Sequence, residues 1–391
     1  MRPLSVTALA VGVAAATALG LSATAHAALP DSNWTEYQPA NNYLPVTGPE
    51  SCVPGTQFCM VISWDTADTQ TPNQFGIADL VTTDSGKTWT AYNNLSPAIN
   101  AMAYLSCASA KVCLGIDGPD LVQTTDGGVT WRKWEPSAWS TESIMFDSLD
   151  CVSAGSCWVT GYTEASGNVF APYLAQVWNG TVFPVTDLPK LGASSTGESY
   201  VLNGFSCGTA VSCVAVGGTI EQGGDNVTLG TSVAITTSDD GAHWRLGTST
   251  GGTLNDVSCV RTGRAFFPSE PPSTCFAVGR TYAPDSASPG AIVLVSRDSG
   301  KTWSSQYSSS DGWSLGSISC ADASHCWATT NDFTQTSMLG TANGGTTWTP
   351  VTSDYSVGEN SAQVANLNAR TWVATTAARI FVTDDDGGLA G

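Results

Sequence analysis

The stretch Thr82-Thr-Asp84-Ser-Gly86-Lys-Thr88-Trp89 decides the fold of this chain, because it recurs along most of its length. Full copies run from Thr124 to Trp131 and from Ser296 to Trp303, and near-copies end at Trp244 and Trp348. In the pattern Ser/Thr-x-Asp-x-Gly-x-Thr-Trp the Asp carboxylate can accept backbone N–H groups across a hairpin turn, Gly can adopt a positive φ, and Trp can anchor the turn between sheets. We call this stretch the repeat turn and predict that it is a structural clamp.

Two cysteines accompany each of six successive units, including a third unit that keeps only Trp178-Asn179-Gly180-Thr181 of the turn. The pairs are Cys52 with Cys59, Cys107 with Cys113, Cys151 with Cys157, Cys207 with Cys213, Cys259 with Cys275, and Cys320 with Cys326. In each unit one antiparallel strand should end at the first cysteine and the next should begin at the second. The thiols then face each other, and six local disulfides are expected. Thiolate-bound zinc would need closer cysteine spacing, so no metal site and no cofactor are predicted.

These units predict an all-β fold, a seven-bladed β-propeller with four strands in each blade. The seventh unit lacks cysteines: Thr371–Thr375 lines up with Cys326–Thr330, and Thr383–Gly387 is a repeat turn that stops before its Trp. Asp31–Tyr37 is similar to the strand that begins at Trp89. The N-terminus is therefore expected to supply the last strand of the seventh blade and to close the ring by interlocked termini.

The repeat turn resembles the Asp-box, or bacterial neuraminidase repeat, of propellers such as sialidases, xyloglucan-cleaving hydrolases and photosystem II assembly factors. The resemblance implies that function lies on the face opposite the repeat turns, as in the enzymes of this family. Sialidases of the family carry an Arg-Ile-Pro segment and three arginines that clamp a carboxylate. No Arg-Ile-Pro occurs here, and Arg132, Arg245 and Arg297 lie at repeat turns, so sialidase activity is not expected.

The first residues are typical of a secretory leader, with Arg2 before an apolar stretch and the small-x-small pattern Ala25-His26-Ala27. We therefore predict a signal peptide over residues 1–27 and a single propeller domain over residues 28–391. An uncleaved membrane anchor is the alternative. Export would place the 12 cysteines in an oxidising compartment, which favours disulfides. The expected product is a secreted, extracellular monomer with no membrane span in the mature chain.

The composition and net charge of the chain limit the classes of partner that it can bind. The chain has 391 residues, of which 14 are Lys or Arg and 33 are Asp or Glu, for a net charge of −19. This charge disfavours nucleic acid and anionic membranes as partners. The 42% hydrophobic residues and 14 Trp are enough for a large core, and the 40 Gly disfavour an α-rich fold.

Candidate ligand-binding residues lie in the loops expected on the face opposite the repeat turns, among them 63–76, 134–148, 161–171, 217–230 and 305–317. They are Trp64, Asp65, Trp139, Glu142 and Trp313. Such Trp side chains can stack on sugar rings, although each could instead pack between blades. The same loops hold further carboxylates, including Asp147. Glycoside hydrolysis needs two carboxylates at about 5–9 Å, and the sequence does not indicate which pair converges.

Three functions remain open at this point. The first is a secreted module that binds an extracellular glycan or protein, because the sequence encodes structure throughout but contains no catalytic motif. The alternative is a polysaccharide-active glycoside hydrolase that uses two loop carboxylates. The third is an assembly-factor-like scaffold, which rests on fold resemblance alone.

Overall fold

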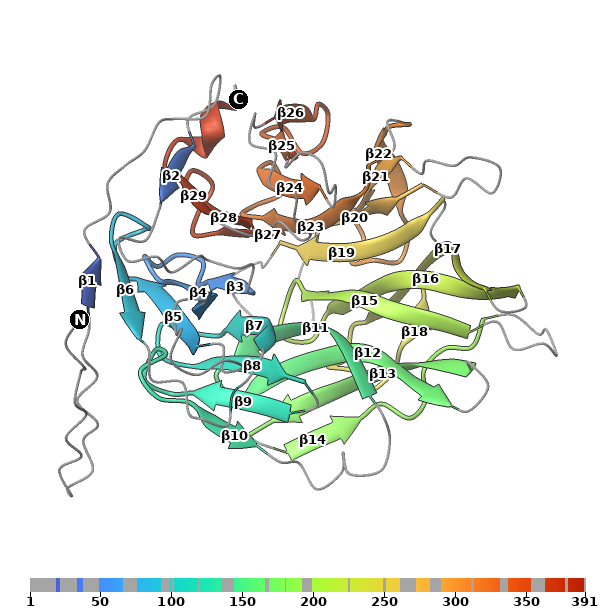
Figure 1. Ribbon diagram of the computed structural model, residues 1–391. Coiled ribbons are helices and arrows are strands. Elements are labelled where there is room, and N and C mark those ends of the chain that lie inside the picture. The colour runs from blue at the N-terminus through green and yellow to red at the C-terminus, as the bar shows by residue number, and fades with distance from the viewer. Residues whose placement is uncertain are drawn as a thin grey trace.

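The computed structural model contains seven antiparallel sheets arranged in a ring, as predicted (Figure 1). The structure describes residues 19–21, 34–37, 49–65, 76–92, 99, 102–118, 120–134, 144–165, 169–179, 181–191, 199–223, 226–248, 251–260, 272–281, 290–310, 313–330, 337–352, 363–376 and 379–389. No α-helix occurs among them, and one 3₁₀ turn, Asp386–Gly388, follows the last strand.

Each sheet is one blade, and, apart from two N-terminal strands described below, its strands run outward from the axis in chain order. Blade 1 holds β3 (Glu50–Cys52), β4 (Cys59–Asp65), β5 (Gly76–Thr82) and β6 (Trp89–Tyr92). Blade 2 holds β7 (Met102–Cys107), β8 (Cys113–Asp117), β9 (Asp120–Thr124) and β10 (Arg132–Trp134). Blade 3 holds β11 (Ile144–Ser153), β12 (Ser156–Ala165), β13 (Val169–Trp178) and β14 (Thr181–Pro184). Blade 4 holds β15 (Ser199–Cys207), β16 (Cys213–Gly223), β17 (Asn226–Thr237) and β18 (Arg245–Leu246).

The remaining blades follow the same plan. Blade 5 holds β19 (Thr253–Cys259), β20 (Cys275–Arg280), β21 (Ala291–Ser296) and β22 (Ser304–Ser308). Blade 6 holds β23 (Leu315–Cys320), β24 (Cys326–Thr330), β25 (Ser337–Thr341) and β26 (Thr349–Thr352). Blade 7 holds β27 (Gln363–Asn366), β28 (Trp372–Thr376), β29 (Arg379–Thr383) and, from the other end of the chain, β2 (Thr35–Tyr37).

The inner strands β3, β7, β11, β15, β19, β23 and β27 surround the axis (Figure 1). The hydrophobic core lies between neighbouring sheets, where, for example, Leu114 and Ile116 of blade 2 pack against Phe146 and Leu149 of blade 3. Hydrogen bonds also join the inner strands. The backbone N–H of the first cysteine of a blade donates to the side chain of the residue before the first cysteine of the preceding blade. For example, the N–H of Cys107 donates to Ser51 Oγ at 2.9 Å. Packing and hydrogen bonds therefore connect each blade to its neighbour.

The repeat turn has the clamp geometry that its residue types predict. The N–H of Thr88 and the hydroxyl of Thr82 both donate to Asp84 Oδ1, at 2.9 and 2.8 Å, and the Thr88 hydroxyl donates to Oδ2. Gly86 has a φ of +82°, and Trp89 is buried. Partial burial alone would raise the pKa of Asp84, but the hydrogen bonds from Thr88 and Thr82 hold it below its usual value.

All six predicted disulfides are present, each between the first two strands of a blade, with Cα atoms 3.9–4.1 Å apart. The disulfides join Cys52 to Cys59, Cys107 to Cys113, Cys151 to Cys157, Cys207 to Cys213, Cys259 to Cys275, and Cys320 to Cys326. No cysteine among the described residues is free. Each of the first six blades therefore carries one disulfide of its own.

The hairpin around Cys157 differs from the expected one. Cys151 pairs with Cys157 as predicted, and both are buried. However, β11 continues past Cys151 to Ser153, and β12 already begins at Ser156, because Ser153 and Ser156 form one more pair of the ladder. The expectation that the second strand begins at the second cysteine is therefore wrong for Cys157. It is confirmed in the other five blades with disulfides.

In blade 7 the alignment with blade 6 was wrong by one residue. Trp372, not Thr371, takes the position of Cys326, because Asn366 pairs with Trp372 as Cys320 pairs with Cys326. In blade 7, which lacks cysteines, the side chains of Asn366 and Trp372 thus take the positions of the two cysteines.

The predicted closure by interlocked termini is confirmed. β2 pairs antiparallel with β29, so the N-terminal segment is the outermost strand of blade 7. The Arg379 guanidinium lies 2.7 Å from a carboxylate oxygen of the buried Glu36. Trp34 is fully buried, and its ring makes an edge contact with Trp327 at a centroid distance of 5.3 Å. Trp34 therefore replaces the Trp that the truncated repeat turn of blade 7 lacks.

A short strand also occurs inside the predicted leader. β1 (Leu19–Leu21) pairs with the outer edge of β6, as a fifth strand of blade 1. Removal of residues 1–27 would leave blade 1 with four strands like the others. Among the described residues, no helix has the length and apolar character needed to cross a membrane.

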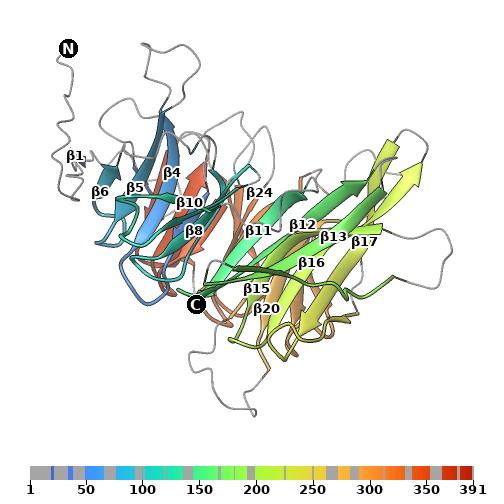
Figure 2. The same ribbon diagram turned by 90° about the horizontal axis from the view of Figure 1, so that it is seen from below.

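Blades 3 and 4 differ from the expected plan, because much of 161–171 and 217–230 is strand and not loop. β12 pairs with β13 out to Ala165 and Val169, and β16 pairs with β17 out to Gly223 and Asn226. Figure 2 shows these two long hairpins extending beyond the other blades. They project on the side where the second and third strands of each blade meet, which is opposite the repeat turns.

Candidate functional site

Five of the seven inner strands carry a β-bulge near their first residues. The register skips one residue in β7, β11, β15, β19 and β23, each time four residues before the first cysteine of the blade. The skipped residues are Ala103, Asp147, Asn203, Asn255 and Gly316. A bulge re-aims its side chain, so the bulges of blades 3, 4 and 5 place polar groups at the axis.

Four of these residues, Asp147, Asn203, Asn255 and Gly316, line a cavity of about 210 Å³ at the axis of the ring. Every blade contributes to its wall, from blade 1 to blade 7 through Pro49, Leu105, Asp147, Asn203, Asn255, Gly316 and Gln363. The wall is formed by the first part of the inner strands, whereas the disulfides lie at or near their last residues. The cavity therefore opens toward the face opposite the repeat turns, where function was expected.

Two of the bulge side chains make the same contact with the next blade. Asn203 Nδ2 donates to the Leu254 carbonyl at 2.8 Å, and Asn255 Nδ2 donates to the Leu315 carbonyl at 2.7 Å. Since the amide nitrogens are used in this way, the Oδ1 atoms are directed away from those carbonyls. The two asparagines thus brace neighbouring blades and offer acceptors at the cavity.

Asp147 occupies the equivalent position in blade 3 but cannot donate a hydrogen bond when ionised. Its Oδ2 atom is buried and has no hydrogen-bond partner among the described residues. Burial raises the pKa of Asp147 to about 7. The carboxyl group therefore changes charge near neutral pH while it lines the cavity.

Asp256 is the second carboxyl group of the cavity wall, and it has a structural role. Its oxygens accept the backbone N–H groups of Val257 at 2.8 Å and Ile318 at 2.9 Å, which ties blade 5 to blade 6. Burial raises the pKa of Asp256 to about 6, although these hydrogen bonds oppose the shift. Among the lining residues, Asp147 is thus the acid whose oxygens are least committed to the backbone.

Among the described residues, one aromatic side chain, that of Tyr104 in blade 2, lines the cavity, and further aromatic side chains lie in blade 3. Burial of Tyr104, together with the nearby Asp147 and Tyr162, raises its pKa. Tyr162 and Phe170 meet edge to face across the long hairpin of blade 3, with centroids 5.5 Å apart. Aromatic faces beside polar groups are a common arrangement in ligand sites.

Of the five predicted ligand-binding residues, only Trp313 has a side chain whose placement the structure describes. Trp64 and Asp65 end β4, opposite Ile77 and Gly76, and the placement of their side chains is not described. Trp139 and Glu142 lie outside the described residues. Trp313 is half-buried, with its ring 6.4 Å from that of Tyr307, and packs against the core between blades 5 and 6. Trp313 does not line the cavity.

The sequence analysis missed Asn203 and Asn255, although a signal for them exists. Counting back four residues from the first cysteine of a unit finds each of these five bulge residues, and only blades 3 to 5 have a polar side chain there. Asp147 was included only as one of many loop carboxylates. Among the described residues, no group of three His, Cys, Asp or Glu side chains is placed to hold a metal ion.

Comparisons with known proteins agree with the propeller architecture. No family model matches the chain, and no curated protein matches it. Among solved structures, YCF48 from Cyanidioschyzon merolae matches with a TM-score of 0.53 at 15% identity, over 91% of this chain and 100% of that one. YCF48 bound to a D1 peptide matches with a TM-score of 0.53 at 14% identity, over 92% and 97% of the two chains.

A third similar structure is an enzyme. The polysaccharide lyase PL25 ulvan lyase, bound to -[GlcA(1-4)Rha3S]-, matches with a TM-score of 0.52 at 8% identity, over 88% of this chain and 96% of that one. At such identities the likeness extends to the fold alone. The chain is therefore similar to propellers that differ in function, and its own site must be interpreted from its own residues.

Proposed function

We propose that this protein is a secreted binding propeller that holds an extracellular glycan or protein over the cavity at its axis. The observation that carries the proposal is the uncommitted Asp147 carboxyl, which lies in a cavity that all seven blades line. A buried oxygen without a partner is unfavourable in a free protein, and a ligand hydroxyl or amide would satisfy it. The neighbouring asparagines add acceptors for the same ligand.

Several features support the rest of the proposal. The clamp geometry at Asp84 and its repeats supports membership of the Asp-box family. Six disulfides are typical of proteins from oxidising compartments, which supports secretion after removal of residues 1–27. The D1 peptide and the saccharide bound to the similar structures suggest which ligand classes to screen. A monomer and a single domain over 28–391 remain part of this proposal.

A glycoside hydrolase is the second candidate, and the pKa of Asp147 favours it. A carboxyl group that titrates near pH 7 can act as a general acid. Such an enzyme also needs a second free carboxylate at about 5–9 Å. Asp256, the other acid of the described wall, instead accepts two backbone N–H groups. Binding without hydrolysis is therefore the better supported function.

One variant separates the two functions. Asp147→Asn keeps the shape of the side chain and gives blade 3 the amide that blades 4 and 5 already carry. For a binding module we expect the variant to stay folded and to change affinity about tenfold or less, because one hydrogen-bonding group is replaced by another. For a hydrolase it should abolish turnover. The measurements are an extracellular glycan array, a protein pull-down and a hydrolysis assay on polysaccharides.

Binding that survives Asp147→Asn but is lost in Asn203→Ala and Asn255→Ala would still place the ligand at this cavity. Hydrolysis by the native protein that Asp147→Asn abolishes would establish the enzyme instead. Ligand binding that none of the three variants changes would contradict the proposed site.

A further inference from the structure

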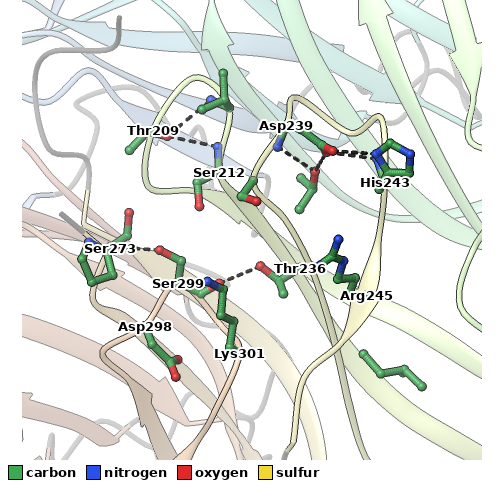
Figure 3. A pocket seen from close by; sticks show the side chains of 15 residues that line it. Thr209, Ser212, Thr236, Asp239, His243, Arg245, Ser273, Asp298, Ser299 and Lys301 are labelled. Atoms are coloured by element: carbon green, nitrogen blue, oxygen red, sulfur yellow. Dashed lines mark hydrogen bonds and ion pairs between the residues drawn. The ribbon is translucent and has the colours of Figure 1, made fainter. Parts of the chain in front are cut away.

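A second cavity, of about 610 Å³, lies between blades 4 and 5 on the opposite face, among the repeat turns (Figure 3). We call it the blade 4/5 groove. One wall is the repeat turn of blade 4 with Asp239, His243 and Arg245, and the other is the repeat turn of blade 5 with Asp298 and Lys301. The groove is thus separate from the cavity at the axis.

The backbone explains how the two turns enclose a groove. β18 is only two residues long, and the chain then crosses to blade 5, where Thr248 and Thr302 form a parallel bridge. Deeper between the blades, the Thr236 hydroxyl donates to the Ser299 carbonyl at 2.6 Å (Figure 3). These contacts fix the two walls relative to each other, so the groove is pre-formed.

The two cations of the groove have no ion-pair partner within the described part of the chain, whereas its two carboxylates accept hydrogen bonds within their own repeat turns and keep their negative charge. Arg245 and Lys301 are exposed and form no ion pair among the described residues. Asp298 accepts the N–H and the hydroxyl of Thr302, at 2.9 and 2.6 Å. Asp239 accepts the N–H of His243 at 3.0 Å and contacts its ring nitrogen Nδ1 at 2.7 Å. In a chain with a net charge of −19, two unpaired cations that face one cavity are unusual.

A buried hydroxyl gives an independent indication of a ligand. Ser273 lines the groove, the residue is only 2% exposed, and its Oγ atom has no hydrogen-bond partner among the described residues. Its N–H is satisfied by Ser299 Oγ at 2.9 Å, so the orphaned atom is the hydroxyl alone. Buried hydroxyl groups normally have partners, and a polar ligand in the groove would supply one.

The repeat itself shows that this interface differs from the others. We compare two repeat positions at each interface that joins two repeat turns: the residue that follows the turn Trp of one blade, and the residue that follows the turn Gly of the next blade. Both positions hold a cation only between blades 4 and 5, where the residues are Arg245 and Lys301. The corresponding pairs at other interfaces that join two repeat turns are Thr90 with Val129, Ser304 with Thr346, Thr349 with Gly388, and Thr35 with Lys87. The two cations are therefore not a consequence of the repeat.

We propose that the blade 4/5 groove binds an acidic oligosaccharide, with Arg245 and Lys301 on its carboxylate or sulfate groups and the lining hydroxyls on its sugar hydroxyls. Guanidinium and ammonium groups suit both anions. The volume lies within the range of small-molecule sites, about 300–1,000 Å³. Hydroxyl side chains outnumber apolar ones on the wall, which favours a saccharide over a peptide that inserts apolar anchors.

The test is titration calorimetry of the mature protein with four probes of similar length: oligogalacturonate, a sulfated dextran oligomer, neutral dextran and oligoglutamate. We expect one or both acidic saccharides to bind, more weakly as salt is added, and neutral dextran not to bind. The variant Arg245→Gln/Lys301→Gln should weaken binding about tenfold or more, because charged hydrogen bonds are lost. Arg245→Lys, which keeps the charge, should retain most of the affinity.

The chain offers a matched control. Lys87 and Arg132 occupy the same repeat positions as Lys301 and Arg245, but at two other interfaces, so Lys87→Gln/Arg132→Gln changes the net charge equally. We expect it to bind like the native protein. Equal losses in both double variants would overturn the proposal, as would no binding of either acidic saccharide or tighter binding of oligoglutamate. Melting temperatures of all variants exclude unfolding as the cause of any loss.

Discussion

Single buried residues join neighbouring blades, and Asp79 is the clearest example. It lies in β5 of blade 1, and its Oδ2 atom accepts the indole N–H of Trp131, the turn Trp of blade 2. Its Oδ1 atom is buried without a partner among the described residues. Gly128 has a φ of +95°, and a Cβ atom there would lie 2.9 Å from Asp79 Oδ2. The carboxyl group is thus enclosed by the repeat turn of the next blade.

The environment of Asp79 makes stability depend on pH. Burial raises the pKa of Asp79 to about 8, above its value in the unfolded chain. Between about pH 4 and pH 8 the folded state then binds more protons than the unfolded state, so the free energy of unfolding falls as pH rises. We expect Asp79→Asn to be more stable than the native protein at pH 8, by a few kcal/mol at about 1.4 kcal/mol per pKa unit. Near pH 4 the difference should disappear.

Urea unfolding at the two pH values measures this effect, and Asp84→Asn is the opposite control. The pKa of Asp84 is lowered, so its ionised form stabilises the folded state above the unfolded pKa, and that contribution is lost as pH falls. Asp84→Asn should therefore lower the free energy of unfolding at pH 8 and have a smaller effect on it at acid pH. A loss of stability at pH 8 in Asp79→Asn would show that the buried group is ionised.

For single residues, the sequence predicted the clamp role of the repeat turn but not the burial of Asp79. Asp84, Gly86 and Trp89 are recognisable because their roles depend on residues within one turn. The burial of Asp79 depends on Gly128 and Trp131, about 50 residues away in the sequence. Such a contact is visible only when two blades are placed side by side.

Among the elements, the hairpins of the first two strands follow directly from the cysteine spacing. Their disulfides close loops of different length: the separation is 16 residues in blade 5 and 6 residues in blade 2. In the loop-entropy model a longer loop contributes more stability, about 3 kcal/mol against about 2 kcal/mol. We therefore expect Cys259→Ser/Cys275→Ser to lose more stability than Cys107→Ser/Cys113→Ser in equilibrium urea unfolding. An equal or smaller loss for the blade 5 pair would contradict the entropic account.

The bulges and the long hairpins are the structural elements that the sequence did not predict. Alternating residues in 219–222 and 226–231 are compatible with strands, but the same stretch is rich in Gly and polar residues and was assigned to a loop. The bulges that direct Asp147, Asn203 and Asn255 to the axis leave no local signal either. Because the side chain at the bulge varies between units, the bulges are recognised only from the strand pairing, which places each of them four residues before the first cysteine.

For the whole molecule, closure of the ring is the feature with the largest expected consequence. The strand that closes it comes from residues about 340 positions away, and it brings the buried Trp34 and Glu36 into blade 7. Without β2, the β29 edge is unpaired and Arg379 loses its carboxylate partner. The sequence predicted this closure because the truncated turn at Gly387 and the orphan Trp34 complement each other.

Deletion of residues 28–37 from the mature chain should therefore destabilise the entire ring. Loss of a buried Trp alone removes about 3–5 kcal/mol, and here a buried ion pair and a strand edge are lost as well. Since each blade is packed between two others, opening one interface exposes the core on both sides of blade 7. Deletion of residues 28–33 is the matched control, because it leaves Trp34 and β2 in place and should keep the melting temperature near that of the native protein. If both truncated proteins melted at the native temperature, blade 7 would be stable with three strands, and interlocked termini would not be what holds the ring closed.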